Sequence, residues 1–558
     1  MATKGPSRVT GARADVAFVN GPVYTVDAAR SWTDAVAVRG GRIAAVGGGA
    51  VRPLIGAGTE VIDLAGKLLL PGFVDAHVHP VMGGTERALC DLTGTSSAAE
   101  CLGRIADYAR EHPDRTWILG GGWSMDQFPR GTPSRLDLDA VVPGRPVYLT
   151  NRDHHGAWVN TRALELAGVG SATPDPEGGR IERDGSGSPQ GTLHEDATML
   201  VAKHTPPATA AEYAAGLLEG QRYLHSLGIT GWQDAIIGPY LGHQDILRTY
   251  LDLAGAGGLT ARVAGALWWD RSRGEEQIGD LLDRREAGQS GRFKANTVKI
   301  MQDGVCENFS AAMLDPYLDG HGRPTTNRGH SFIHAGALAR YVTRLDAEGF
   351  QVHFHAIGDR AVRESLDAVA AARAANGWHD HRHHIAHIQV VHPGDIRRFR
   401  DLGVAANMQP LWATADAQMR DLTIPFLGQP RSQWQYPFGS LRASGAVLAA
   451  GSDWPVSSPD PLHGIHTAVN RTGPGNGFAD EPFLPGERLA LGDAIAAYTI
   501  GSAWVSHLDR EAGSIETGKY AALIVLDRNP FAGDPGGIAG TRVEMTFVQG
   551  TLVHALAG

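Results

Sequence analysis

The feature that most constrains the fold is the alternation of helix and strand patterns from about residue 210 onward. A helical stretch (AAEYAAGLLEGQRYLHSL) ends at Gly228 and leads into the apolar run ITGWQDA. The same order recurs up to a last apolar run, AVLAAGSDWPV. Near-continuous apolar strands separated by helices are typical of a parallel sheet covered by helices. With FVDAHVH as the first strand, close to eight such units predict a (β/α)₈ barrel of the TIM type.

A doubly wound open sheet is the poorer alternative, because no Gly-rich phosphate loop follows a strand. The two chain ends instead show short β-branched runs broken by Asn-Gly and Gly-Gly turns. We expect residues 1–70 and 509–558 to form one small β-sandwich, with the barrel in residues 71–508. Residues 114–206 are rich in Gly, Pro, Asp and Trp, and we expect them to form a lid at the barrel mouth.

Composition excludes several classes of partner. The chain has 558 residues, 20% of them charged, with a net charge of -10 and a pI near 6.2. This charge gives no reason to expect nucleic acid or an anionic membrane as partner. No export signal or membrane span is recognised, so we expect a cytoplasmic protein that acts on a small molecule and could form a homo-oligomer. The three cysteines are too few and scattered for a disulfide framework or a Cys-based zinc site: Cys90, Cys101 and Cys306.

The stretch PGFVDAHVHP places His77 and His79 one residue apart at the end of a predicted strand. Side chains at i and i+2 of a strand point to the same face, so the two imidazoles converge. That spacing suits metal ligation, since neutral imidazole is a common zinc ligand. A polar patch at a strand end is the alternative.

Four further side chains of suitable chemistry end predicted barrel strands. In a (β/α)₈ barrel, the residues that bind ligands lie at the C-terminal ends of the strands. Taken singly, each of these four side chains has an ordinary alternative to metal binding. It could be a hydrogen-bonded core histidine (as we expect for His353), a helix cap, or part of a solvated tract such as HDHRHHIAH. Those alternatives do not explain why all of them end barrel strands. The four are Lys299, His355, His387 and Asp453.

Lys299 is the most unusual member, because lysine is almost never fully buried without a partner. Beside divalent cations a protonated amine would be repelled, so it should be neutral or chemically changed. A neutral amine can add carbon dioxide to give a carbamate, an anion able to bridge two metals. The alternative is an ion pair with Asp303.

The whole chain resembles the amidohydrolase superfamily, and within it the branch called amidohydrolase family 3 or the YtcJ-like proteins. The motifs that carry the resemblance include PGFVDAHVHP, GGGWSMD, VKIMQDGV, HFHAIGDRAV, IAHIQVVHP and GSDWPV. The resemblance implies a (β/α)₈ barrel with a small β-sandwich made from both chain ends. It also implies a centre of one or two divalent metals, most often zinc, with ligands at His77, His79, Lys299 as carbamate, His355, His387 and Asp453.

Two positions depart from the branch's usual pattern. Ala386 stands where an acidic residue commonly precedes the strand-six histidine, and His154 stands where a small residue commonly precedes His155. Neither departure removes a ligand.

The expected chemistry is hydrolysis by metal-activated water, with Asp453 as general base. His387 or His155 is expected to stabilise the oxyanion, although His155 could equally be structural in the lid. Tryptophans near the mouth suggest an apolar substrate group, although tryptophan is also a common core residue. The expected substrate contacts are His155, Trp123, Trp268 (with its neighbour Trp269) and Trp412.

The family includes enzymes that cleave N-substituted formamides and other acyclic amides, so an N-acyl or N-formyl amine is the first choice of substrate and a cyclic amide the second. Deamination of a heterocycle is the nearest rival, but it usually needs no bridging lysine. Decarboxylation on the same metal site is another. A non-catalytic scaffold is least favoured, because such proteins lose ligands and all six are present here.

Overall fold

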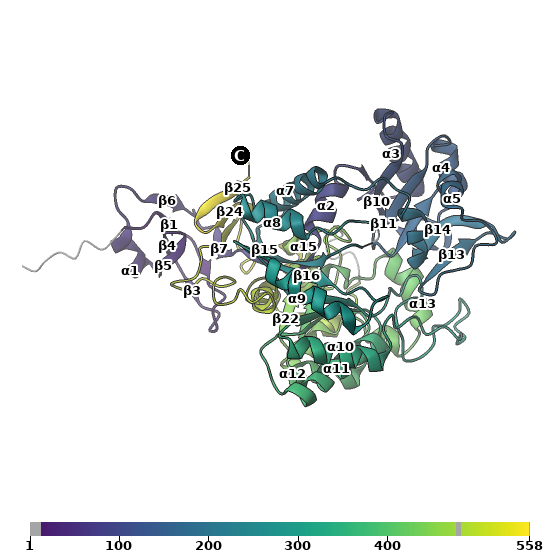
Figure 1. The fold of residues 1–558 in the computed structure, drawn as a ribbon. Coiled ribbons are helices and arrows are strands. Elements are labelled where there is room, and N and C mark those ends of the chain that lie inside the picture. The colour runs from purple at the N-terminus through teal and green to yellow at the C-terminus, as the bar shows by residue number, and fades with distance from the viewer. Residues whose placement is uncertain (1–12, 241, 476–480, 557–558) are drawn as a thin grey trace, which may run out of the picture.

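The computed structural model describes residues 13–240, 242–475 and 481–556, and its centre is a barrel of parallel strands (Figure 1). Each strand pairs in parallel with the next one in the barrel. The predicted (β/α)₈ barrel is therefore confirmed. Its strands in order are β8 (Phe73–Val78), β15 (Ile229–Ile237), β16 (Arg262–Trp268), β18 (Phe293–Met301), β19 (Gln351–Ala356), β20 (His384–His387), β21 (Ala405–Met408) and β22 (Leu448–Ala450).

The first and last strands meet just beyond the end of β22. The Asp453 amide donates to the His77 carbonyl at 2.7 Å, and the His79 amide donates to the Trp454 carbonyl at 2.9 Å. Gly451 permits this approach, because a Cβ there would lie 2.6 Å from the backbone nitrogen of His77. The closure therefore brings the His-x-His pair and Asp453 to the same edge of the barrel.

Helices surround the barrel, as the amphipathic patterns predict. The helix before β15, α7 (Ala210–Ser226), begins with a capping box in which Thr209 and Glu212 satisfy each other's backbone amides. The bulk of the apolar core lies between strands and helices and is continuous around the barrel. The other helices in this layer include α2 (Pro80–Glu86), α8 (Leu247–Gly255), α9 (Ile278–Ala287), α10 (Ala335–Ala347), α11 (Asp359–Asn376), α12 (Ile396–Leu402), α14 (Phe438–Ser444) and α15 (Pro461–Asn470).

Both chain ends contribute to one pair of sheets at the side of the barrel (Figure 1). The central contact is antiparallel pairing of β7 (Leu68–Pro71) with β23 (Leu523–Leu526). Phe18, Leu69 and Phe547 pack in the core between the two sheets. The remaining strands are β1 (Val16–Val19), β4 (Val36–Arg39), β5 (Arg42–Val46) and β6 (Glu60–Asp63) in one sheet, and β2 (Val23–Tyr24), β3 (Trp32–Thr33), β24 (Val543–Val548) and β25 (Thr551–Ala555) in the other.

A third sheet lies on the side of the barrel opposite the terminal sheets and has its own apolar clusters (Figure 1). We call this unit the lid. The division of the chain at residues 70, 114, 206 and 509 stays a prediction, and residues 1–12 and 557–558 of the predicted terminal unit lie outside the described residues. The lid contains β9 (Cys90–Asp91), β10 (Ile118–Trp123), β11 (Val147–Asn151), β12 (Gly156–Val159), β13 (Gly179–Arg183) and β14 (Pro189–Glu195), with α3 (Ala98–Glu111), α4 (Arg135–Val141) and α5 (Thr161–Ala167).

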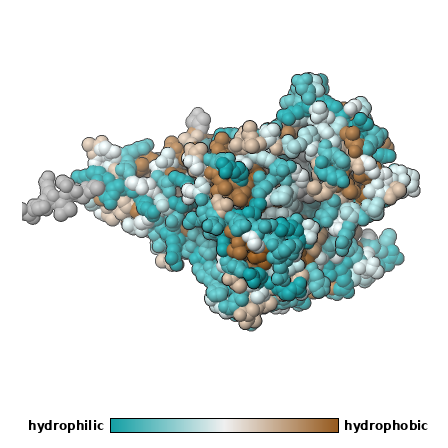
Figure 2. All heavy atoms as spheres, in the orientation of Figure 1, coloured by the Kyte–Doolittle hydropathy of each residue, from teal (hydrophilic) through white to brown (hydrophobic). Residues whose placement is uncertain are grey.

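The visible face of the molecule is mainly hydrophilic, with separate patches of hydrophobic residues near its middle (Figure 2). Among the described residues, no helix is both long and apolar enough to cross a membrane. Cytoplasmic location and a possible homo-oligomer stay predictions.

Candidate metal centre at the barrel mouth

All six predicted ligands line one cavity at the C-terminal ends of the barrel strands. They arrive from five different places along the barrel, so only the closed fold brings them together. We call this set the mouth cluster: His77 and His79 at the end of β8, Lys299 on β18, His355 on β19, His387 at the end of β20, and Asp453 just after β22.

Asp453 is the centre of the mouth cluster. Its Oδ1 lies 3.1 Å from His77 Nε2 and 2.9 Å from His79 Nε2, and its Oδ2 lies 3.9 Å from His387 Nδ1. One ligand atom from each of His77, His387 and Asp453 lies within 4.8 Å of the others. The His355 ring completes the group, with its centroid 4.4 Å from that of His387.

The backbone at two of these positions is strained. Asp453 has φ 58° and His387 has φ 76°, values in the left-handed region that residues other than glycine rarely adopt. The surrounding fold holds both: the His387 amide donates to Gln409 Oε1 at 2.7 Å, and the Asp453 amide donates to the His77 carbonyl. Such strain concentrates at functional sites, where it aims side chains into a cavity.

Charge states in the mouth cluster suit a divalent cation. Burial, helped by Lys299, lowers the pKa of His77 to about 3, and burial lowers the pKa of His387 well below its usual value. Burial would raise the pKa of Asp453, but His77 and His79 hold it well below its usual range. Neutral imidazoles beside an ionised carboxylate are the donor set that zinc binds. Buried Nδ1 atoms of His79 and His387 also lack hydrogen-bond partners, so the site fits a metal.

Lys299 is buried in the cavity wall and is 3% exposed. Its Nζ lies 3.5 Å from His77 Nε2 and 3.5 Å from His353 Nε2, and burial lowers its pKa to about 7. The alternative ion pair with Asp303 is not formed, since that carboxylate accepts instead from three backbone amides. These belong to Ala312, Ile357 and Gly358.

Two supporting residues of the mouth cluster were not assigned to it from the sequence. His353 was expected to be a hydrogen-bonded core histidine; it is buried, and its Nε2 lies 2.9 Å from His77 Nδ1. A ring nitrogen held this way orients the other nitrogen of a ligating histidine. Asp75 accepts from the amides of His77 and Ser452 and so ties the first strand to the last. His353 could have been assigned from the sequence, because it is two residues from His355 and so lies on the same face of β19.

His155 reaches the same cavity from the lid, and its partner Glu195 was not predicted at all. His155 Nδ1 lies 3.0 Å from both Glu195 carboxylate oxygens. That carboxylate also accepts from Ser310 Oγ at 2.6 Å and Asn308 Nδ2 at 3.0 Å, on the barrel loop after β18. A Cβ at Gly304 would lie 2.4 Å from Glu195 Oε1, so glycine makes room for it.

The pair is charged at neutral pH. Burial would lower the pKa of His155, but Glu195 raises it to about 9. Burial would likewise raise the pKa of Glu195, but His155 lowers it to about 2. Because Nδ1 of His155 is bound to Glu195, its Nε2–H remains available as a hydrogen-bond donor to a group in the cavity.

The tryptophans divide into three groups. Trp268 lines the cavity as expected. Trp412 stacks on His387, with centroids 5.2 Å apart and an interplanar angle of 6°, so it supports that imidazole ring. Trp123 corrects an expectation: it is fully buried in the lid core against Phe128, and its Nε1–H donates to the Leu149 carbonyl, so it does not reach this cavity. The neighbour of Trp268, Trp269, is also buried.

The departure at residue 154 falls inside the cavity, whereas the one at Ala386 is buried in the barrel. His154 lines the wall with its backbone at φ 61°. Its Nε2 lies 3.6 Å from Glu86 Oε1, and burial raises the pKa of Glu86 to about 8.

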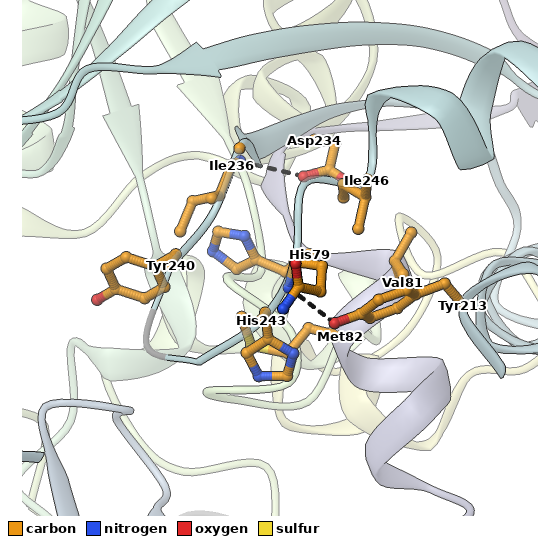
Figure 3. A pocket seen from close by; sticks show the side chains of 11 residues that line it. His79, Val81, Met82, Tyr213, Asp234, Ile236, Tyr240, His243 and Ile246 are labelled. Atoms are coloured by element: carbon orange, nitrogen blue, oxygen red, sulfur yellow. Dashed lines mark hydrogen bonds between the residues drawn. The ribbon is translucent and has the colours of Figure 1, made fainter. Parts of the chain in front are cut away.

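A largely apolar recess adjoins the mouth cluster (Figure 3). Its wall shares His79, Met82, Ile236 and Tyr240 with the cavity of the mouth cluster. The recess therefore gives the reaction centre an apolar neighbour. Its other walls include Val81, Tyr213, Asp234, His243 and Ile246.

Comparisons with known proteins identify the family of the chain. The profile described as "Amidohydrolase family" matches residues 60–554. Putative amidohydrolase YtcJ of Bacillus subtilis is 31% identical over 89% of this chain and 90% of its own length. N-substituted formamide deformylase of Arthrobacter pascens is 30% identical over 98% of this chain and 99% of its own. The crystal structure of an uncharacterized metal-dependent hydrolase from Pyrococcus furiosus is 27% identical, with a TM-score of 0.69, over 92% of this chain and 99% of that one.

Proposed function

This chain belongs to the amidohydrolase family, and from that premise we propose that it hydrolyses the amide bond of an N-formyl or N-acyl amine. The chain is a metal-dependent hydrolase acting on carbon–nitrogen bonds. The observation that carries the finer proposal is the convergence of the six-residue mouth cluster on one cavity beside an apolar recess. A relative that covers nearly the whole chain carries the name N-substituted formamide deformylase.

The mouth cluster would hold one or two divalent ions, with zinc as the first choice because its donors are imidazole and carboxylate. We propose that Lys299 is carboxylated on Nζ, which would add a second anion to the site. Its burial lowers the pKa of its amine to about 7 and so favours the neutral form, whose nitrogen lone pair forms the new bond to carbon dioxide while a proton leaves. The chemistry such ions supply when bound is a lowered pKa for coordinated water and a polarised carbonyl.

Asp453 is the general base in this proposal. It is ionised at neutral pH. Burial alone would raise its pKa, but its histidine neighbours hold that pKa well below the usual range. It therefore can take the proton from the attacking water and pass it to the departing nitrogen.

His155 is the donor to the developing oxyanion. Glu195 fixes its Nδ1 and keeps the ring protonated, so Nε2–H is available to the carbonyl oxygen as negative charge grows there. His387 is held by Trp412 and serves as a ligand and as a second candidate for this role.

The substrate's amine portion should be apolar. Trp268 and the recess wall offer apolar surface next to the reacting centre, and burying an apolar group there favours binding. The rival reactions, deamination and decarboxylation, find no specific support in the geometry.

The test is a product assay on N-alkyl and N-aryl formamides, the matching acetamides, and a lactam. Equal amounts of formate and amine from the formamides would support the proposal. Ammonia from a heterocyclic amidine, or carbon dioxide from a carboxylic acid, with no formate or acetate from the amides, would contradict it.

A further inference from the structure

A second cluster of metal-type side chains lies outside the barrel mouth. Asp346 is in the last turn of α10, and His379 and His381 are in the segment that joins α11 to β20. β20 ends in the mouth at His387, so these residues lie at the opposite end of the same strand. We call them the outer cluster. From the sequence alone, the histidines of this tract looked like a solvated run.

The donor atoms of the outer cluster already lie close together. His379 Nδ1 is 3.6 Å from Asp346 Oδ2, and His381 Nε2 is 3.9 Å from Asp346 Oδ1. One ligand atom from each residue lies within 4.8 Å of the others. In a tetrahedral zinc site with bonds of about 2.0–2.2 Å, donor atoms are about 3.3–3.5 Å apart. The two shortest contacts exceed that spacing by about 0.1–0.6 Å and reach different oxygens of Asp346, so the imidazoles must move slightly to hold one ion.

The carboxylate is oriented by two residues that are not themselves ligands. The Val352 amide donates to His383 Nδ1 at 3.0 Å, so that nitrogen carries no proton and Nε2 does. His383 Nε2–H therefore donates to Asp346 Oδ1 at 2.9 Å, and Asn376 Nδ2 donates to Oδ2 at 2.9 Å. Supporting hydrogen bonds of this kind fix the ligands of built metal sites.

The loop that carries the histidines is held in place from the other side. Arg382, between His381 and His383, has φ 58° and a buried side chain. Its guanidinium bonds to Asp380, Asp509 and the Trp504 carbonyl. These contacts stabilise a left-handed backbone and so fix the direction of the flanking imidazoles.

Access and charge set the expected affinity. Asp346 has a fully buried side chain, while the side chains of His379 and His381 are 45% and 21% exposed, so an ion could enter from solvent. Arg373 opposes it: its Nη1 lies 3.7 Å from Asp346 Oδ1. That guanidinium also donates to the His379 carbonyl and stacks over Trp378, which anchors it. A moderate rather than tight affinity follows.

We propose that Asp346, His379 and His381 form a further divalent-metal site, for zinc or a similar borderline cation, that fastens the end of α10 to the segment entering β20. Imidazole and carboxylate donors with an open face toward water match the chemistry of such ions. This site is independent of the proposed amide hydrolysis, because none of its ligands lines the mouth cavity.

The test is a titration of the full-length protein with Zn²⁺, monitored by calorimetry. The variants are His379→Ala/His381→Ala and, as a matched control, His204→Ala/His321→Ala, which removes two exposed histidines elsewhere. Parent and control should show one more binding event than the double variant. His379→Ala alone should weaken that event at least about 10-fold, in line with losses seen when metal-site residues are removed.

A spectroscopic readout identifies the ligands. The Cu²⁺ spectrum of the parent minus that of the double variant should show hyperfine coupling to two imidazole nitrogens, because the mouth cluster contributes equally to both. Equal zinc stoichiometry and affinity in parent and double variant would overturn the proposal. Loss of the event in the control variant would also overturn it, because it would mean that scattered surface histidines bind the ion.

Discussion

The mouth cluster and the outer cluster both include two histidines at i and i+2, and they lie at opposite ends of β20, yet they differ in almost everything else. The mouth cluster is buried and draws on five places along the barrel. The outer cluster is partly exposed and comes from two neighbouring segments. Histidine spacing alone therefore does not distinguish a reaction centre from a surface site.

The two clusters differ in whether their residues lie inside a cavity. The mouth cluster shares its cavity with Trp268 and with His155 from the lid, and it adjoins an apolar recess. The outer cluster has supporting hydrogen bonds, but its residues line neither the mouth cavity nor the recess. Catalysis requires groups that face the reacting atoms in addition to metal ligands.

The largest expected effect on kcat comes from replacing one aspartate in each cluster with asparagine. Asp453→Asn keeps the shape but cannot accept a proton, so kcat should fall by about 10²–10⁴-fold, the usual range for a general base. Asp346→Asn should leave kcat within a factor of about two, because its carboxylate is remote from the cavity. Formate release and circular dichroism would be measured on both. Near-parent kcat in Asp453→Asn would remove it as the base.

Glu195→Gln tests the lid's contribution through pH. In the parent, Glu195 raises the pKa of His155 to about 9, so the proton on His155, and the stability this pair adds, is lost as pH rises through about 9. With glutamine, the largest contribution that raises the pKa of His155 is lost while burial still lowers it, so that pKa falls. The alkaline limb of kcat/KM should move to lower pH, and kcat should drop about 10-fold or more. An unshifted pH profile would show that His155 is only structural.

Two tryptophans sharpen the contrast between cavity wall and core. Trp268→Ala should raise KM for formamides with bulky apolar substituents about 10-fold and change KM little for N-methylformamide, because it removes cavity surface. Trp123→Ala should instead cost about 3–5 kcal/mol of stability in the lid core. Michaelis parameters and thermal unfolding on both variants check this. A substituent-dependent KM change in Trp123→Ala would place it against the substrate after all.

The smallest effect is expected at the outer cluster. His379→Ala/His381→Ala should retain kcat and KM, since its side chains are outside the cavity. Added Zn²⁺ should raise the Tm of the parent slightly more than that of this variant, because an ion that binds only the folded state stabilises it. Scanning calorimetry with and without zinc is the measurement, and a large loss of activity would mean that the two ends of β20 are coupled.

Local pattern explains why much of this architecture is predictable. Apolar runs between amphipathic helices define the barrel, and because parallel strands end at one face, Lys299, His355 and Asp453 could be expected together. Period-two spacing placed His77 beside His79.

What could not be predicted depends on contacts distant in sequence. Glu195 and His155 are 40 residues apart and meet only through the lid sheet, which no spacing rule describes. Trp123 was expected at the substrate because tryptophan suits both a cavity wall and a core, and only tertiary packing decides which. The outer cluster likewise depends on where α10 ends relative to the loop after α11.

The most direct test of the central claim is zinc content per chain, measured by mass spectrometry after gel filtration. The His379→Ala/His381→Ala protein is the background, so that only the mouth cluster is counted, and it is compared with and without Lys299→Ala. We expect close to two ions when Lys299 is present and one or none when it is replaced. Equal content in the two proteins would contradict a centre built on Lys299.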